Sequence, residues 1–124
     1  PAQSIVQTAL GGYQSVETYI QPGGRIFEQR DFIYKALNDI PGVSAVKPKA
    51  AFYIFPKLDI KKFNILNDEK FAIDFLREKK VLIVPGSGFN WESPNHFRVV
   101  YLPRLSVLEK SMEGLKDFLS HYRQ

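Results

Sequence analysis

The chain has 124 residues, enough for one compact domain and too few for two of ordinary size. Its composition of 44% apolar, 14% aromatic and 24% charged residues is typical of a folded protein and excludes a disordered segment. Zero cysteines and two histidines exclude thiolate catalysis, disulfides and Cys- or His-rich metal sites, and a net charge of +4 is too small to indicate nucleic-acid binding.

The chain lacks the features of a membrane or exported protein. No run approaches the roughly 20 apolar residues that a membrane-spanning helix needs. The first residues, Pro1-Ala2-Gln3, resemble neither an initiator methionine nor a signal peptide. We therefore expect a piece of a longer, cytoplasmic protein without a membrane partner.

The N-terminal region predicts two helices separated by a turn. Residues 2–10 are good helix formers, and Gly11-Gly12 supplies a stop at their C-terminal end. Pro22-Gly23-Gly24 is a strong break. From Arg25 to Asp39 the apolar residues recur at helical spacing, and Pro41-Gly42 follows where that helix must end.

A β-hairpin is predicted next. The runs Val43–Lys47 and Ala51–Phe55 are rich in β-branched and aromatic residues, and Pro48-Lys49-Ala50 joins them. Both faces of the second run are apolar, which indicates a central strand that is covered on both sides. The segment Lys57–Asn67 that follows is predicted to be a charged connection.

The second half of the chain predicts a helix and then two strands. Asp68–Lys80 has an apolar stripe, with acidic residues at its start and basic residues at its end, as the helix dipole favours. Val81–Val84 and His96–Tyr101 are predicted strands on either side of the loop Pro85–Asn95.

A long helix is predicted at the C-terminal end. Ser106-Val107-Leu108-Glu109 has the pattern of a capping box, and the residues after it include an apolar stripe with helical spacing. The stripe consists of Leu105, Leu108, Met112, Leu115, Leu119 and Tyr122. Hairpin-paired strands with helices packed on one face predict an α+β fold, with a small mixed or antiparallel sheet of about four strands.

Arg98 is the first candidate for a binding role. It lies in the last predicted strand, on the face opposite Phe97 and Val99. A guanidinium is permanently charged, and its planar fork matches a carboxylate through two parallel hydrogen bonds. The alternative is an arginine on the solvated face of an edge strand.

The other candidates are weaker. The glycines of Pro85–Asn90 could leave N–H groups free to meet an anion, but their spacing is neither a P-loop nor a dinucleotide fingerprint. His96 and His121 have no carboxylate paired with them in the sequence. Asp68-Glu69 is explained by a helix start, and the lysines lie in polar connections or at helix ends, where they are solvated.

Three segments in order resemble a known family. Residues 48–56 (PKAAFYIFP), 81–89 (VLIVPGSGF) and 97–100 (FRVV) are similar to the small domain of fold-type I, pyridoxal-phosphate-dependent aminotransferases. The N-terminal stretch PAQ…QTALGGYQ and the stretch Phe89-Asn90-Trp91 resemble the bacterial glutamate–pyruvate (alanine) aminotransferase branch of that family.

The resemblance implies a domain assignment, because it runs over essentially the whole chain. Residues 1–124 would be one domain, the C-terminal small domain of a longer aminotransferase, and residues 1–20 a helical lead-in from its large domain. One departure is Ala50, where the family usually has glycine. This departure bears only on the backbone of the predicted hairpin turn, since alanine disfavours positive φ.

The resemblance also implies roles for particular residues. Arg98 matches the arginine that grips the α-carboxylate of the substrate, in a protein that moves an amino group between an amino acid, alanine, and 2-oxoglutarate. Ser87, Phe89, Asn90 and Trp91 match the wall of the substrate entrance.

The remaining parts of such an enzyme are expected elsewhere. The family's Schiff-base lysine and its other cofactor-binding residues belong to the large domain, and no segment here resembles them. We therefore expect no catalytic residue and no metal site in this segment. We also expect pyridoxal 5′-phosphate in the parent but not in the isolated segment, which should be inactive alone. The implied partners are the large domain, amino and keto acid substrates and a second copy of the parent in a homodimer.

Two other classes of function remain open on the sequence. A stand-alone amino-acid-binding module of ferredoxin-like type has a similar alternation of strands and helices, and it would bind its ligand without help. A structural or interaction domain would bind no small ligand and would bury an exposed apolar patch against a partner.

Overall fold

The computed structural model of the protein describes all 124 residues. Its helices are η1 (Ala2–Ile5), α1 (Val6–Gly11), α2 (Glu17–Ile20), α3 (Arg25–Asn38), α4 (Ile60–Phe63), α5 (Asp68–Lys79), η2 (Gly86–Phe89) and α6 (Leu105–His121). The elements η1 and η2 are single 3₁₀ turns. No helix has both the length and the apolar character that crossing a membrane requires.

Five short strands form two antiparallel sheets. β1 (Val43–Ser44) pairs with β3 (Lys57–Leu58). In the other sheet, β5 (Phe97–Val100) lies between β2 (Tyr53–Ile54) and β4 (Val84–Pro85). The predicted α+β class and antiparallel pairing are confirmed, whereas the strands divide into two sheets where about four strands in a single sheet were expected.

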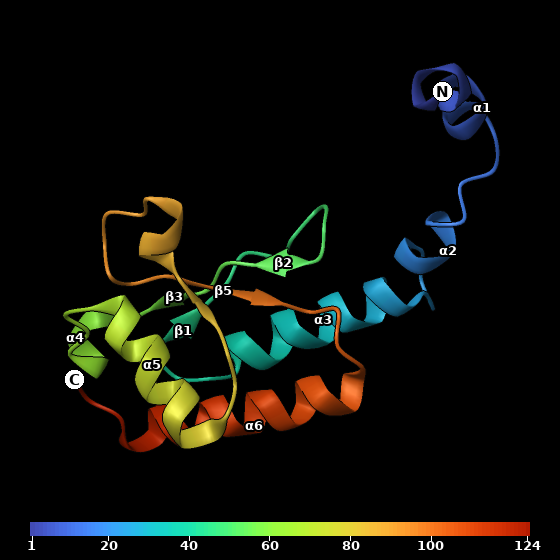
Figure 1. Cartoon of the computed structure of the whole chain (residues 1–124). Coiled ribbons are helices and arrows are strands. Elements are labelled where there is room, and N and C mark those ends of the chain that lie inside the picture. Colours follow the sequence, from blue (N-terminus) through green and yellow to red (C-terminus); the bar gives the residue numbers. More distant parts are fainter.

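One apolar core joins the strands to the helices. Figure 1 shows that α3, α5 and α6 lie together below the strands, while the η2 turn rises on the other side. Ile33 and Leu37 of α3, Phe75 of α5 and Leu115 of α6 are completely buried. Burying a side chain of this size contributes about 1.5–3 kcal/mol. The apolar stripes thus fix the three long helices, whose predicted positions are confirmed.

The predicted hairpin of Val43–Lys47 with Ala51–Phe55 is wrong. The backbone N–H of Ala45 donates to Oδ1 of Asn38 at 3.0 Å, and the Ala45 carbonyl accepts from Nδ2 of the same side chain at 3.2 Å. The side chain of Asn38 thus takes the N–H of Ala45 and one lone pair of its carbonyl, in place of a neighbouring strand. β1 therefore ends at Ser44.

The segment predicted as a charged connection supplies the true partner of β1. Val43 lies opposite Leu58 of β3, and both side chains are buried in the core. The next residue, Asp59, caps α4 by accepting hydrogen bonds from the N–H groups of Lys61 and Lys62. Burial of an apolar pair distant in the sequence decided this pairing, which local patterns could not reveal.

Two further strand predictions need correction. β2 is an edge strand and not a covered central one, and its Tyr53 is 38% exposed. β4 begins at Val84 and not at Val81, because Lys80 ends α5 in the left-handed conformation (φ 59°) and redirects the chain. Leu82, which lies within the predicted strand, is outside β4 and 75% exposed as a result.

The predicted capping box of the last helix is also wrong. α6 begins at Leu105 with Arg104 as its N-cap, so Ser106 already lies inside the helix. The preceding connection is held against α3, because Arg25 and Gln29 donate side-chain hydrogen bonds to the carbonyls of Leu102 and Pro103. These contacts hold the residues just before α6 in place, and the helix begins nearer the N-terminus than the serine pattern predicts.

The turn before β2 contains a left-handed alanine. The residue with positive φ is Ala51 (58°), one position after the expected Ala50. A left-handed conformation costs a non-glycine residue about 1–2 kcal/mol. The buried hydroxyl of Tyr101 offsets this cost by donating to the Ala51 carbonyl at 3.0 Å. The expectation about Ala50 itself therefore does not apply.

Residues 1–20 form an arm that leaves the core, shown in blue in Figure 1. The predicted helix over residues 2–10 is present as η1 and α1, which ends at Gly11. Several large apolar side chains of the arm are at least half exposed: Ile5, Leu10, Tyr13, Val16, Tyr19 and Ile20. The arm thus presents apolar surface that the rest of the chain does not cover.

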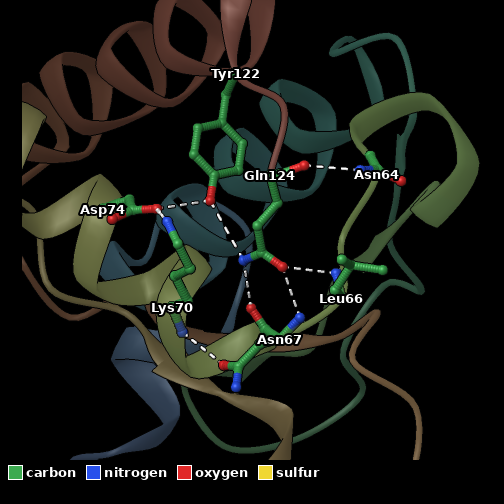
Figure 2. A network of polar contacts seen from close by, with 7 residues as sticks. All are labelled: Asn64, Leu66, Asn67, Lys70, Asp74, Tyr122 and Gln124. Carbon is green, nitrogen blue, oxygen red and sulfur yellow. Dashed lines mark hydrogen bonds and ion pairs between the residues drawn. The ribbon is translucent and has the colours of Figure 1, made fainter.

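The last residue fastens the C-terminal end to the start of α5, as Figure 2 shows. Oε1 of Gln124 accepts from the N–H groups of Leu66 and Asn67 at 2.6 and 2.7 Å, and its Nε2 donates to the Asn67 carbonyl at 2.7 Å. Asn64 donates its side-chain amide to the Gln124 carbonyl at 2.7 Å. The side-chain amide of Gln124 therefore pairs with backbone groups of residues 66 and 67 as a neighbouring peptide group in a sheet would.

A second set of contacts supports the same corner (Figure 2). The hydroxyl of Tyr122 donates to Oδ2 of Asp74 at 2.9 Å, and Lys70 pairs with the same oxygen. The hydrogen bond from Lys70, partly opposed by burial and aided by Tyr122, lowers the pKa of Asp74. Burial, followed by the bond to Asp74, raises the pKa of Tyr122 to about 12.

Candidate functional site

Arg98 lies at the centre of β5, the middle strand of the three-stranded sheet. Its neighbours Phe97 and Val99 are buried against the helices, so alternation places Arg98 on the opposite face. The side chain is half-buried there. The predicted alternation along this strand is confirmed, and β5 is not the edge strand that the alternative interpretation of Arg98 required.

Two aromatic rings hold the guanidinium of Arg98. Its Cζ lies 4.6 Å from the ring centroid of Tyr53 on β2 and 4.4 Å from that of Phe89 at the end of η2. Both distances are well inside the roughly 6 Å range of a cation–π interaction. These contacts use the faces of the rings and none of the N–H donors, so they restrict the side chain without occupying its hydrogen bonds.

The donors of Arg98 have no partner within the chain. No carboxylate forms an ion pair with the guanidinium, and its Nε is buried without a hydrogen-bond acceptor. A buried donor left unpaired costs about 1–3 kcal/mol, and more when the group is charged. Such a group is expected to have a partner that the chain itself does not supply.

The guanidinium borders an open hollow of about 260 Å³. The lining residues are Tyr53, Ile54, Phe55, Phe89 and Arg98. Arg98 is thus the only charged group in an otherwise apolar and aromatic surface. Apolar walls strengthen the attraction between a cation and an anion that enters, because they lower the local dielectric constant on the side that they cover.

A compact aromatic cluster adjoins the hollow. The ring of Phe55 stacks on that of His96 at a centroid distance of 4.9 Å, and Trp91 contacts both rings edge-on. Phe55 also meets Phe89 edge-to-face at 6.2 Å. Each such pair adds about 0.5–1.5 kcal/mol beyond burial, so the cluster fixes the ring that covers Arg98.

Asn95 determines the protonation of His96. Its Oδ1 accepts from Trp91 Nε1 at 3.0 Å and lies 2.6 Å from Nδ1 of His96. Since the indole can only donate, the atom between them is an oxygen, and Nδ1 of His96 must carry the proton. Burial, followed by the charge of Lys57, lowers the pKa of His96. This shift favours the neutral imidazole, which packs in the aromatic cluster.

Of the four residues predicted to form the wall of the substrate entrance, only Phe89 lines the hollow beside Arg98. Trp91 does not line it and belongs to the adjoining aromatic cluster. Ser87 and Asn90 do not line the hollow. Asn90 ends η2 in the left-handed conformation (φ 58°), and its N–H donates to the Ser87 carbonyl at 3.0 Å.

The first two N–H groups of the turn Gly86–Phe89 are not free to bind an anion. Its start lies against β5, since the N–H of Gly86 donates to the His96 carbonyl at 2.9 Å and a Cβ at Gly86 would lie 2.8 Å from that oxygen. The N–H of Ser87 donates to the Asp68 carboxylate at 2.7 Å, and the N–H of Trp91 to the Gly86 carbonyl. These N–H groups are already occupied, and the turn serves to position Phe89.

No other group of side chains forms a comparable site. His121 pairs with Glu78 at the surface, and no cluster of three or more metal-ligating side chains is present. A larger groove of about 470 Å³ follows β1 and β3, but its acid Asp59 is engaged in capping α4. Its lysines, Lys57 and Lys61, are exposed to solvent.

Sequence reasoning missed several residues of the site. Tyr53 and Phe55 lie two positions apart in the predicted strand, which is a usable signal, but the apolar pattern predicts a covered face for them. No local sequence pattern indicates the role of Asn95, because that role depends on the hydrogen bond between its side chain and the Trp91 indole. The sequence predicts a role for Asp68 at the start of a helix, whereas in the structure Asn67 caps α5 and Asp68 accepts a hydrogen bond from η2.

Comparison with known proteins connects this geometry to a family. The family model "Aminotransferase class I and II" matches residues 1–110. A glutamate–pyruvate aminotransferase of Haemophilus influenzae is 56% identical over the whole chain, which covers 31% of that relative. An alanine aminotransferase of Mycobacterium bovis is 49% identical over the whole chain, which covers 29% of it.

A solved structure has the same fold. The crystal structure of an aminotransferase from Escherichia coli superimposes with a TM-score of 0.94 at 55% identity, covering all of this chain and 31% of that one. The chain thus spans about a third of the length of the relatives that it matches. The chain belongs to the class I and II aminotransferase family.

Proposed function

We propose that this chain is the part of a pyridoxal-phosphate-dependent, alanine-type aminotransferase that holds the substrate's α-carboxylate through Arg98. The reaction would move an amino group between alanine and 2-oxoglutarate. The family match and the printed names of the relatives support this proposal. The single observation that carries the role of Arg98 is its guanidinium, held by two rings beside a hollow and without any partner in the chain.

The arrangement suits a carboxylate in particular. The N–H groups of a guanidinium lie at its edge, and one edge offers two parallel donors to the two oxygens of a carboxylate. A carboxylate in the hollow would supply acceptors for the terminal N–H groups of Arg98, which have no partner in the chain. Binding would then satisfy a donor and neutralise a cation in one step.

The residues of this hollow do not fit the cofactor itself. Pyridoxal phosphate is attached through a lysine in this family, and no lysine lines the hollow. We infer that the cofactor is held by the remainder of the longer protein and that it supplies the bond chemistry there. The residues of this chain bind and orient the substrate: Arg98 fixes the carboxylate, and Tyr53 and Phe89 fix Arg98. Orientation of this kind lowers the barrier of the reaction as well as improving binding.

The rest of the longer protein is part of the proposal. We infer that residues 1–124 are its C-terminal small domain and that residues 1–20 lead in from the large domain. The exposed apolar side chains of the arm support this, because they need a covering surface. A homodimer of the intact protein is proposed on the resemblance to the family.

Substitution of Arg98 in the intact protein tests the proposal. Arg98→Ala should raise KM for alanine and lower kcat, with kcat/KM falling about 30-fold or more, since removing one partner of a desolvated charge pair costs about 2–5 kcal/mol. Arg98→Lys should recover little activity, because an ammonium cannot make the paired contact. Wild-type constants in either variant would refute the role of Arg98.

The isolated chain provides a second test. Mixed with pyridoxal phosphate, alanine and 2-oxoglutarate, it should form no pyruvate in a coupled assay, whereas the intact protein should. Calorimetry of the isolated chain with free amino acids should show no binding. Tight binding by the chain alone would favour the stand-alone amino-acid-binding module instead.

A further inference from the structure

The carboxylate of Asp68 is unusual for its place in the fold. It belongs to the first residue of α5, where acidic side chains are normally exposed, yet Asp68 is only 7% exposed. The helix does not need it as a cap, because Asn67 accepts from the N–H of Lys70 at 2.8 Å. The burial of a charged group here therefore requires another explanation.

The explanation lies in the next element along the sheet. Oδ2 of Asp68 accepts a hydrogen bond at 2.7 Å from the backbone N–H of Ser87, the second residue of η2. The first N–H groups of a short helix have no partner within it, and η2 has no side-chain cap of its own. Asp68 thus caps η2 from a different helix, with a charge-assisted bond.

This bond connects α5 to the ring that covers Arg98. Ser87 is held by Asp68 on one side, and Gly86 is held against the His96 carbonyl on the other. Phe89 ends the same four-residue turn, with its ring 4.4 Å from Cζ of Arg98. Because η2 is a single turn whose first two residues are held, the position of Ser87 sets the position of the Phe89 ring. A shift of Ser87 is therefore expected to move Phe89.

We propose that Asp68 is a positioning residue for the carboxylate clamp, acting through the η2 turn and Phe89 on Arg98. This inference rests on the proposed function of Arg98. Asp68 touches neither the guanidinium nor the hollow, so its effect must pass through the Ser87 N–H. The Gln124 side chain also holds Asn67 at the start of α5 (Figure 2). These bonds fix the backbone next to Asp68 and so the position of its carboxylate.

The test uses variants of the intact protein. Asp68→Ala should speed hydrogen exchange of the Ser87 amide about tenfold, the change expected for one lost bond to a charged acceptor. It should also raise KM for alanine about twofold, no more than loss of the Phe89 ring itself would, and lower kcat less, because it shifts the ring without removing the guanidinium. Asp68→Asn keeps an acceptor oxygen at the same place and should restore both properties toward wild type.

Glu69 provides the matched control. It carries the same charge in the same first turn of α5, but it is exposed and forms no ion pair. Glu69→Ala should leave KM and the exchange of Ser87 unchanged. Should Asp68→Ala not fold, Asp68→Glu keeps the charge while misplacing the oxygens, and its comparison with Asp68→Asn provides the same test.

Three results would overturn the positioning role: unchanged exchange at Ser87 in Asp68→Ala, faster exchange with a wild-type KM, or equal effects of Glu69→Ala. The proposed function fails in a different experiment. Wild-type KM in Arg98→Ala would refute the clamp itself, whereas wild-type KM in Asp68→Ala alone would refute only the positioning role.

Discussion

Removal of the Phe89 ring should weaken substrate binding although the ring makes no hydrogen bond. In the structure this ring and that of Tyr53 restrict a guanidinium that has no other partner. Without Phe89, Arg98 can adopt other rotamers in the absence of substrate. A bound carboxylate must then also offset the entropy of ordering the arginine side chain, which amounts to at most about 2 kcal/mol when fully free.

The magnitude follows from the exposure of the rings. Phe89 is 43% exposed and Tyr53 38%, so each cation–π contact is expected at the low end of its range, about 0.5–1 kcal/mol. Since about 1.4 kcal/mol corresponds to a factor of ten, loss of one ring should raise KM about twofold to fivefold. The remaining ring still holds Arg98, so the loss should stay well below that of Arg98→Ala.

Steady-state kinetics of the intact protein with alanine as the varied substrate provide the assay. Phe89→Leu is the matched control, because it keeps apolar cover over the guanidinium while removing the π face. Its KM should lie between those of the wild type and Phe89→Ala. If Phe89→Ala and Tyr53→Ala both leave KM unchanged, the rings do not hold the guanidinium and the reasoning fails.

Three further predictions concern stability and are checked by denaturant unfolding. Gly86→Ala should destabilise the protein by about 1–3 kcal/mol, because its Cβ would lie 2.8 Å from the His96 carbonyl oxygen; full stability would contradict that close approach. Lys70 holds the pKa of Asp74 below its usual 3.8, so the stability difference between wild type and Asp74→Asn should be present above pH 4 and shrink as the pH falls further; a difference independent of pH would contradict it. Gln124→Ala should cost about 1–2 kcal/mol through its lost side-chain hydrogen bonds, and no loss would show that they contribute nothing.

The three long helices could be predicted from the sequence, whereas the short helices α2 and α4 and the strand pairing could not. A helix such as Arg25–Asn38 is marked by its own apolar spacing and by the Pro41-Gly42 that follows. The pairing of β1 depends on Asn38 occupying the backbone of Ala45, a contact that no local pattern shows. Strands of two residues carry too little alternation to choose a partner.

In the candidate site too, a residue marked by a local pattern could be predicted, whereas contacts between distant segments could not. Arg98 could be found because it alternates with buried neighbours on its own strand. Tyr53 reaches it only through the pairing of β2 with β5, which no pattern in the sequence indicates. Asp68 has an obvious local role at a helix start, and this concealed its bond to Ser87, nineteen positions along the chain.

A crystal structure of the intact protein with a bound amino acid or keto acid tests the central claim most directly. The substrate's α-carboxylate should lie on one edge of the Arg98 guanidinium, with two N–H···O distances of about 2.7–2.9 Å and with Tyr53 and Phe89 still against the guanidinium. A substrate whose carboxylate is bound by another cation, with Arg98 left in solvent, would contradict it.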